Sequence, residues 1–174
     1  DGMHLNWPST YIKRGWWADP KSPKENDKYE QAVREIESYF ESSSSQCLSD
    51  QEQVDLKKNG LCTVIQGEMS LYIHVNESKA MIDALAFCNR WDIRPIFYGA
   101  RDAMNISELL KKHEAILVLK RVKSLPSRID QHILSSYELP AALHRAEIPF
   151  AIADNGSWQQ RNLIYQASQA IAHG

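Results

Sequence analysis

Short apolar runs alternate with longer amphipathic runs between residues 71 and 174. The apolar runs are about five residues long and rich in β-branched or aromatic residues, which is typical of buried strands. The runs between them, such as Ser78–Arg90 and Asn105–His113, carry apolar residues at helical spacing. The sequence therefore predicts an α/β fold with four parallel strands in sequential order, joined by helical crossovers. The predicted strands are residues 71–75, 94–98, 115–119 and 149–153.

Polar residues follow each predicted strand. A parallel sheet with helical crossovers places a functional site at the carboxyl ends of its strands. We therefore expect candidate functional residues in four segments. These segments are His74–Glu77, Tyr98–Asp102, Lys120–Asp130 and Asp154–Trp158.

The N-terminal part of the chain has a different composition. Residues 1–23 are rich in tryptophan and proline, and we predict an extended arm that packs on a surface, or alternatively an aromatic wall for a ligand. A helix is predicted from Asn26 or Asp27 to about Phe40, because its apolar residues form one stripe. The four serines at 42–45 predict a flexible loop after it.

A second helix is predicted before the strands begin. Ser49 opens a capping box, Ser-x-x-Glu, and the apolar pattern continues to about Gln66. The Asn59-Gly60 pair predicts a kink or restart within this helix, and Gly67 its final cap.

The length of the chain limits the architecture. Its 174 residues suffice for a sizeable core, whereas a complete eight-stranded α/β barrel needs about 250. We predict that residues 1–48 form an N-terminal arm and helix, and that residues 49–174 form a half-barrel domain. Because four strands leave two open edges, we expect them to be covered by the arm, by another copy of the chain or by the remainder of the same barrel.

Charge and hydropathy exclude some functions. A net charge of -2 and a pI near 6.3 argue against nucleic-acid binding. No apolar run approaches the roughly 20 residues that span a membrane. The start, Asp1-Gly2-Met3, lacks the pattern of a signal peptide and indicates a processed or cut polypeptide, so the compartment stays open.

The three cysteines form no CxxC pair. An odd count favours reduced thiols, with a Cys47–Cys62 bridge as the alternative. Cys88 lies in a helical pattern beside Phe87, so we predict that it is buried.

Common catalytic motifs, GxxxxGK[ST], HExxH, GxSxG and GxGxxG, do not occur in the chain. What does occur is a histidine at a strand end, His74 in Leu-Tyr-Ile-His-Val-Asn-Glu. Further features are the helix Ser78–Phe87, the segments Leu125–Asp130 and Leu139–Leu143, and the C-terminal Phe150–Asp154 and Arg161–Leu163. In their order and spacing, these features make residues 49–174 resemble the second half of the (β/α)8 barrel of the amidohydrolase superfamily, in particular its imidazolonepropionase-like branch.

The resemblance implies metal-dependent hydrolysis of amide or cyclic-amide C–N bonds, usually with zinc. His74 matches the metal-binding histidine of the fifth strand, and Asp154 lies near the eighth-strand aspartate, a metal ligand that also handles the proton. The HxH of the first strand is absent, and residues 96–101, the sixth-strand position, contain no histidine. We therefore expect this chain alone to be inactive and possible metal binding to require groups from elsewhere.

Each of these two residues also has a structural alternative. His74 can be a strand-end histidine that is hydrogen-bonded to backbone. Asp154 can cap the helix predicted from Trp158 to Ala172.

A group of cations follows the predicted strands. Lys120, Arg121, Lys123 and Arg128 follow the third strand and Arg101 follows the second, so that one rim could bind a carboxylate or phosphate. The alternative is a solvated rim that is partly neutralised by Asp102 and Asp130. Our candidate substrate-binding residues are Asn76, Arg101, Lys120, Arg121 and Arg128.

Three hypotheses of function follow. The first is a fragment of an amidohydrolase-like protein, either completed by other groups or a pseudoenzyme that has lost its metal site. The second is a flavodoxin-like or half-barrel module that binds a small anionic ligand or a protein partner without catalysis. The third is a scaffold whose tryptophan-rich arm is the docking surface.

Overall fold

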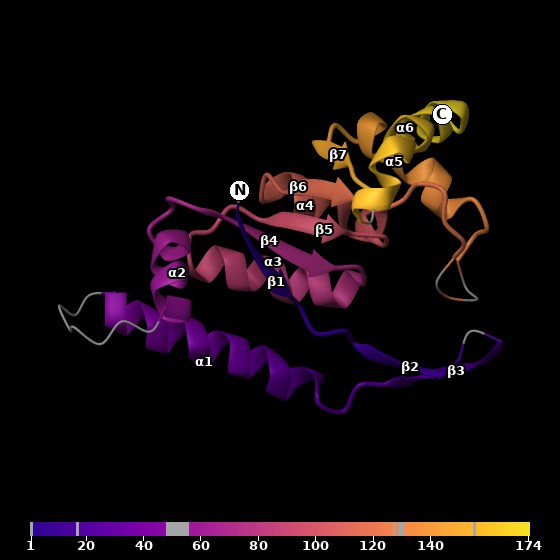
Figure 1. Cartoon of the computed structure of the whole chain (residues 1–174). Coiled ribbons are helices and arrows are strands. Elements are labelled where there is room, and N and C mark those ends of the chain that lie inside the picture. Colours follow the sequence, from indigo (N-terminus) through magenta and orange to yellow (C-terminus); the bar gives the residue numbers. More distant parts are fainter. Residues whose placement is uncertain (1, 17, 48–55, 127, 129–130, 155) are drawn as a thin grey trace.

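The computed structural model describes residues 2–16, 18–47, 56–126, 128, 131–154 and 156–174. Five parallel strands form one sheet in the order β1-β4-β5-β6-β7, and β2 and β3 form a separate hairpin (Figure 1). The strands are β1 (Gly2–Asn6), β2 (Tyr11–Trp16), β3 (Asp19–Glu25), β4 (Ser70–Val75), β5 (Ile96–Gly99), β6 (Ile116–Leu119) and β7 (Phe150–Ile152). The α-helices are α1 (Tyr29–Cys47), α2 (Leu56–Ile65), α3 (Ser78–Arg90), α4 (Ser107–Lys112), α5 (Ser135–Arg145) and α6 (Leu163–Ala172), and the 3-10 helices are η1 (Ala103–Ile106) and η2 (Ser157–Asn162).

All four strands predicted from the pattern are present, and they pair in sequential order. The order has no reversal of direction, whereas a doubly wound sheet such as that of flavodoxin reverses at its switch point. When right-handed crossovers advance in one direction, their helices lie on one face of the sheet. The topology is therefore consistent with a partial α/β barrel and disfavours the flavodoxin-like alternative.

The two faces of the sheet differ in burial. In β4, Leu71, Ile73 and Val75 are buried, whereas Tyr72 and His74 on the opposite face are only half-buried. The buried face packs against α3, whose apolar residues recur at helical spacing. A half-covered second face is what an unclosed segment of a barrel leaves open.

The N-terminal arm predicted over residues 1–23 is wrong, because this segment contains strands. β1 joins the sheet beside β4, so the sheet has five strands instead of four. Trp7 then enters the core, where its indole N–H donates to the Tyr29 hydroxyl (3.2 Å) and its ring meets Phe87 edge-on. The tryptophan belongs to the core and does not form a wall for a ligand.

Two further predictions about the N-terminal helices are corrected. α1 continues through the serines predicted to form a loop, and Ser43 and Ser45 satisfy their hydroxyl groups within the helix by donating to carbonyls four residues earlier, at Tyr39 and Glu41. α2 runs through Gly60 without a break.

The end of α2 is as predicted, whereas its expected start is not described. Gly67 adopts a positive φ of 76° just beyond the helix, as expected of a final cap. The capping box at Ser49 and the predicted domain boundary after residue 48 lie outside the described residues.

The cysteines are not all reduced, which corrects the expectation from their odd count. Cys47 at the end of α1 is joined to Cys62 in α2 by a disulfide. Cys88 is a free, buried thiol as predicted, and burial raises its pKa to about 12. Cys88 is therefore a structural residue without a nucleophilic thiolate at neutral pH.

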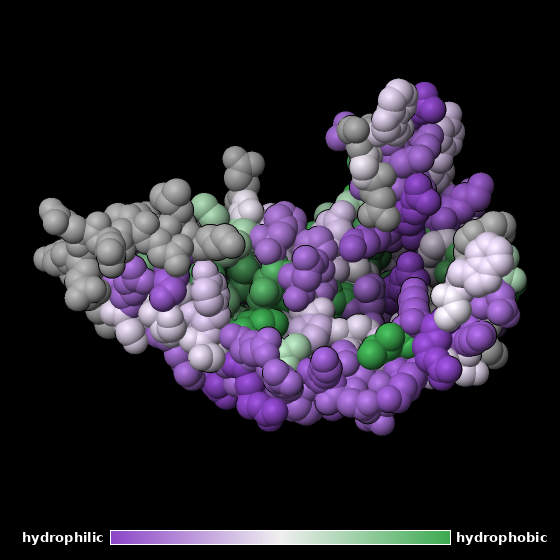
Figure 2. Space-filling model, turned by 60° about the horizontal axis from the view of Figure 1, so that its bottom comes forward, coloured by the Kyte–Doolittle hydropathy of each residue, from purple (hydrophilic) through white to green (hydrophobic). Residues whose placement is uncertain are grey.

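The surface is mainly hydrophilic on the face that Figure 2 turns forward, and hydrophobic residues show in a recess near its middle. Among the described helices, none has the length and apolar character needed to cross a membrane.

Candidate functional site

Two histidines meet on neighbouring strands, His74 near the carboxyl end of β4 and His4 in the middle of β1. Nδ1 of His4 in β1 lies 2.8 Å from Nε2 of His74 in β4, which is hydrogen-bonding distance. Since a neutral imidazole has one donor and one acceptor nitrogen, one ring donates to the other. The Tyr98 ring of β5 lies beside His74, with 4.6 Å between their centroids. The structural alternative for His74 was a hydrogen bond to backbone, whereas its partner here is the side chain of His4.

A lysine faces the same residues from β6. Nζ of Lys120 lies 4.6 Å from the centre of the Tyr98 ring, a cation–π contact. Burial and the nearby Arg101 guanidinium lower the pKa of Lys120. Burial, the charge of Lys120 and the adjacent His4 lower the pKa of His74. His74 is therefore held neutral at pH 7 beside a cationic side chain.

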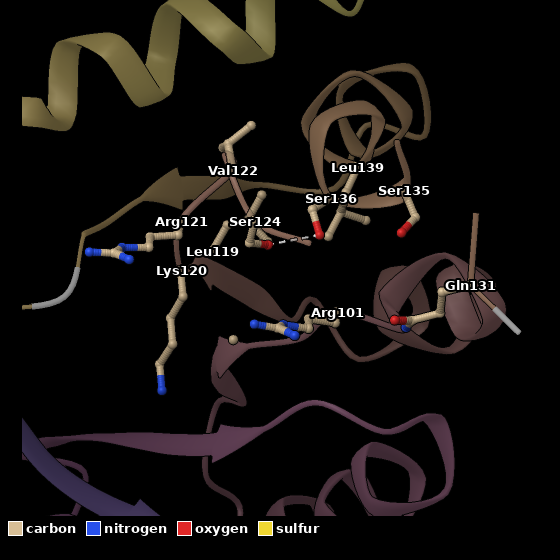
Figure 3. Close-up of a pocket in the computed structure, with 11 residues that line it drawn as sticks. Arg101, Leu119, Lys120, Arg121, Val122, Ser124, Gln131, Ser135, Ser136 and Leu139 are labelled. Carbon is tan, nitrogen blue, oxygen red and sulfur yellow. Dashed lines mark hydrogen bonds between the residues drawn. The ribbon is translucent and has the colours of Figure 1, made fainter. Parts of the chain in front are cut away.

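Three of the predicted cations lie around one small cavity. Arg101, Lys120 and Arg121 line it together with Ser124 and Ser136, whose hydroxyls are 3.0 Å apart (Figure 3). The cavity volume is about 20 Å³, enough for one water molecule. A larger ligand would therefore lie over the mouth of this cavity.

A tight turn after β5 positions Arg101 at the carboxyl-end edge of the sheet. Gly99 and Ala100 both have positive φ, 111° and 48°. A Cβ on Gly99 would lie 2.6 Å from the side-chain oxygen of Asn76 and 3.0 Å from the Val75 carbonyl. The turn is tied to β4 because the Ala100 N–H donates to the Val75 carbonyl (2.7 Å). Ala100 shares the positive φ with Asp92, Glu114 and Glu147, which lie in other turns, so the conformation marks a tight turn and does not by itself mark a site.

Asp154 is a buried, paired carboxylate. Its side chain is only 2% exposed, and Arg121 Nε donates to it at 2.9 Å. The side-chain amide of Gln166 in α6 donates to its second oxygen at 3.2 Å. The residue before η2 is Gly156, so Asp154 is not the predicted helix cap. These contacts tie the end of β7 to β6 and α6.

Arg128 lies apart from the cavity, although the sequence analysis grouped it with the other cations. Its guanidinium pairs with the buried Asp102 at 2.6 Å, and Gln131 donates to the same carboxylate at 3.1 Å. This pair is the neutralised arrangement that was considered as the alternative. Lys123 does not line the cavity either, and its backbone N–H donates to Gln166.

The described side chains do not fit a catalytic metal centre. No three His, Cys, Asp or Glu side chains of the described part of the chain come close enough together to hold a metal ion, whereas a catalytic zinc needs three protein ligands. His74 is bonded to His4, and Asp154, which follows β7, is paired with Arg121. No reaction step through a metal can be derived from these residues.

The remaining histidines lie away from this edge. His113 caps α4, His144 lies in the last turn of α5, and the His173 ring packs on Tyr137. His132 is exposed and 3.8 Å from Glu138.

The sequence analysis missed His4. The run Met3-His-Leu-Asn-Trp7 alternates apolar and polar residues with a period of two, which is typical of a half-buried strand. The same alternation occurs around His74, and the sheet pairs Asn6 with His74. This alternation was the available signal, but the prolines around it suggested an arm.

Comparisons with known proteins support the fold. The structure resembles the crystal structure of an amidohydrolase from Thermotoga maritima MSB8 with a TM-score of 0.74 and 15% sequence identity. The match covers 84% of this chain and 40% of that protein, so the chain spans less than half of its structural neighbour. No protein-family model and no curated protein sequence matches the chain. The chain therefore has an amidohydrolase-like α/β fold.

Proposed function

We propose that this chain forms the ligand-binding edge of an amidohydrolase-like hydrolase, and that this edge binds a carboxylate or another small anion. In the complete protein, the bound molecule would be a substrate with an amide or cyclic-amide C–N bond. The chain alone would bind the anion without hydrolysing it. The proposal rests on the amidohydrolase-like fold and on the cations at the strand ends.

The observation that carries the proposal is a pair of cations without a carboxylate partner among the described residues. Arg101 and Lys120 take part in no ion pair with another described residue, whereas Arg121 and Arg128 each have a buried carboxylate partner. Two nearby cations repel each other, and after burial this repulsion by Arg101 is the second cause of the lowered pKa of Lys120. An anion bound between them would remove that repulsion and accept hydrogen bonds from both.

The two imidazoles extend the site. His74 lies on the strand next to that of Tyr98 and His4 lies one strand further, so a molecule held by Lys120 can extend towards the nitrogens of His74. A divalent metal in the complete protein would require ligands from outside this chain in addition to His74. Asp154 could become a further ligand only after losing its pairing with Arg121.

The test is a calorimetric and NMR titration of the chain with succinate and, separately, with inorganic phosphate. Lys120→Met and Arg101→Gln should each weaken binding by roughly tenfold to a hundredfold, since hydrogen bonds to charged groups contribute about 1.5–3 kcal/mol. Lys112→Met, on the exposed last turn of α4, is the matched control and should bind as the wild type does. Equal affinities for all variants would refute the proposed site.

A hydrolysis assay separates binding from catalysis. The chain is incubated with a panel of N-acyl amino acids and cyclic amides, with and without added zinc. We expect no turnover above the uncatalysed rate. Turnover that is lost in His74→Ala would contradict the proposed inactivity of the isolated chain, while leaving the anion site intact.

The second candidate is a half-barrel module that binds an anion but belongs to no hydrolase. The same unpaired cations favour it. It differs from the first in predicting that anion binding never leads to hydrolysis, even in a longer polypeptide that contains this chain.

A further inference from the structure

The C-terminal helix α6 and the turn before it expose large apolar side chains. Trp158 in η2 is 81% exposed, and Ile164, Tyr165 and Ile171 in α6 are 70%, 67% and 80% exposed. Single exposed apolar residues are ordinary, but three large ones on one ten-residue helix, with a fourth in the turn before it, expose together on the order of 500 Å². A patch of that size is at the upper end of what monomeric proteins leave open.

The amphipathic pattern of α6 is inverted. The residues that α6 buries are Gln166 and Ala170, whereas its isoleucines face solvent. Gln166 holds the helix in place through polar contacts, by donating to Asp154 and accepting from the backbone of Lys123. Burial within this chain therefore does not explain the isoleucines of α6.

The exposed face of α6 is suited to pairing with another helix. Ile164 and Ile171 are seven residues apart and so lie on one stripe of the helix. Ser168, between them, is small, and its hydroxyl donates to the Ile164 carbonyl within the helix. The stripe thus has apolar side chains at its ends and a small, internally bonded residue at its centre, which permits close approach of a second helix.

The charges around α6 are complementary to those of a second copy of the same helix. The helix has no charged residue between Leu163 and Ala172, so two copies of it would meet without repulsion. Arg161 lies in the turn just before the helix. In an antiparallel pair, Arg161 of each copy would lie beside the C-terminal end of the other helix, where the helix dipole favours a cation.

We propose that α6 docks against α6 of a second copy of this chain, antiparallel and about a twofold axis near Ser168. Ile164 of each copy packs against Ile171 of the other, and Trp158 and Tyr165 close the sides. A twofold contact uses the same patch on both copies, and the patch has the self-complementarity that such a contact requires. Its area is below the roughly 800 Å² per partner of a standard interface, which indicates a weak, concentration-dependent dimer.

Sedimentation velocity and light scattering of the whole chain over a range of micromolar concentrations test this proposal. We expect a monomer–dimer equilibrium that Ile171→Glu weakens by at least about tenfold, because each dimer loses two buried isoleucines. Ile12→Glu is the matched control. Ile12 is also exposed (50%) but lies in the β2–β3 hairpin, far from α6 in Figure 1, and its substitution should leave the equilibrium unchanged.

A cysteine cross-link tests the geometry independently. Ser168→Cys should form a disulfide-linked dimer under mild oxidation, because the axis brings the two copies of residue 168 together. Ser38→Cys, on the exposed side of α1, should remain a monomer under the same conditions. A chain that stays monomeric at every concentration, or a dimer that withstands Ile171→Glu, would overturn the proposal. A monomer would mean that another segment or protein covers α6.

Discussion

Asp154 is the residue for which a structural and a catalytic role make opposite predictions. Its buried carboxylate accepts hydrogen bonds from Arg121 and Gln166. In Asp154→Ala, the buried Gln166 amide loses a partner, which costs about 1–3 kcal/mol. Arg121 also loses a charged partner, but its side chain is 43% exposed and water replaces much of that interaction. We therefore expect Asp154→Ala to lower the free energy of unfolding by about 2–4 kcal/mol.

The measurement is urea unfolding followed by tryptophan fluorescence, together with thermal unfolding. For a chain of this size, the expected loss corresponds to a decrease in Tm of roughly 5–15 °C. Asp154→Asn, which keeps one acceptor oxygen, should lose about half as much. Asp27→Ala is the control, because its pair with Lys24 is exposed and surface pairs contribute at most about 1 kcal/mol.

The refuting result is an Asp154→Ala variant within about 0.5 kcal/mol of the wild type, the range of ordinary surface substitutions. The pairing of Asp154 with Arg121 and Gln166 would then contribute no net stability. A carboxylate kept buried without a stabilising role would be a strong candidate for catalysis in the complete protein.

Three further predictions concern the site and the disulfide. Lys120→Met should raise the pKa of His74, because a positive charge that opposes its protonation is removed, as measured by NMR titration of the imidazole C–H signals. Since folding lowers the pKa of His74, the unfolded chain binds the proton more tightly. Stability should thus be full above the unfolded pKa of about 6.5 and decrease as the pH falls below it, and Lys120→Met should flatten this dependence. Replacing Cys47 and Cys62 by alanine should cost about 3 kcal/mol in urea unfolding, the loop-closure value for a separation of 15 residues, and reductant should then have no further effect. Gly99→Ala should destabilise the chain and weaken succinate binding, because the added methyl group would meet oxygen atoms at 2.6 and 3.0 Å and the backbone φ is 111°. Unchanged succinate binding would show that this turn does not position the site.

The strands from β4 to β7 were predictable because their apolar runs are short and bounded by clear helical patterns. β1 was not, because its strand pattern is followed at once by prolines and tryptophans, and its pairing with β4 is a tertiary contact between distant segments. The continuation of α1 through its serines likewise goes with tertiary contacts, since the end of α1 packs on α2 and is joined to it by the Cys47–Cys62 disulfide.

The candidate site was predictable in part. Strand ends identified His74, Arg101, Lys120 and Arg121, because the carboxyl ends of parallel strands meet at one edge. The sequence does not indicate which cations have partners: the pairing of Arg128 with Asp102 depends on how the segment after β6 returns to η1.

The pairing of β1 with β4 makes the His4–His74 contact the product of a long chain closure. The two histidines are 70 residues apart, so bringing them together in the unfolded chain costs on the order of 4 kcal/mol of entropy. Contacts of this separation slow folding, because the loop-closure entropy is lost before the contact forms. An edge strand with few buried residues is also among the first elements to open in the native state. Local opening of β1 would therefore remove His4 from the site. Anion binding that uses His4 would in turn stabilise the pairing of β1 with β4.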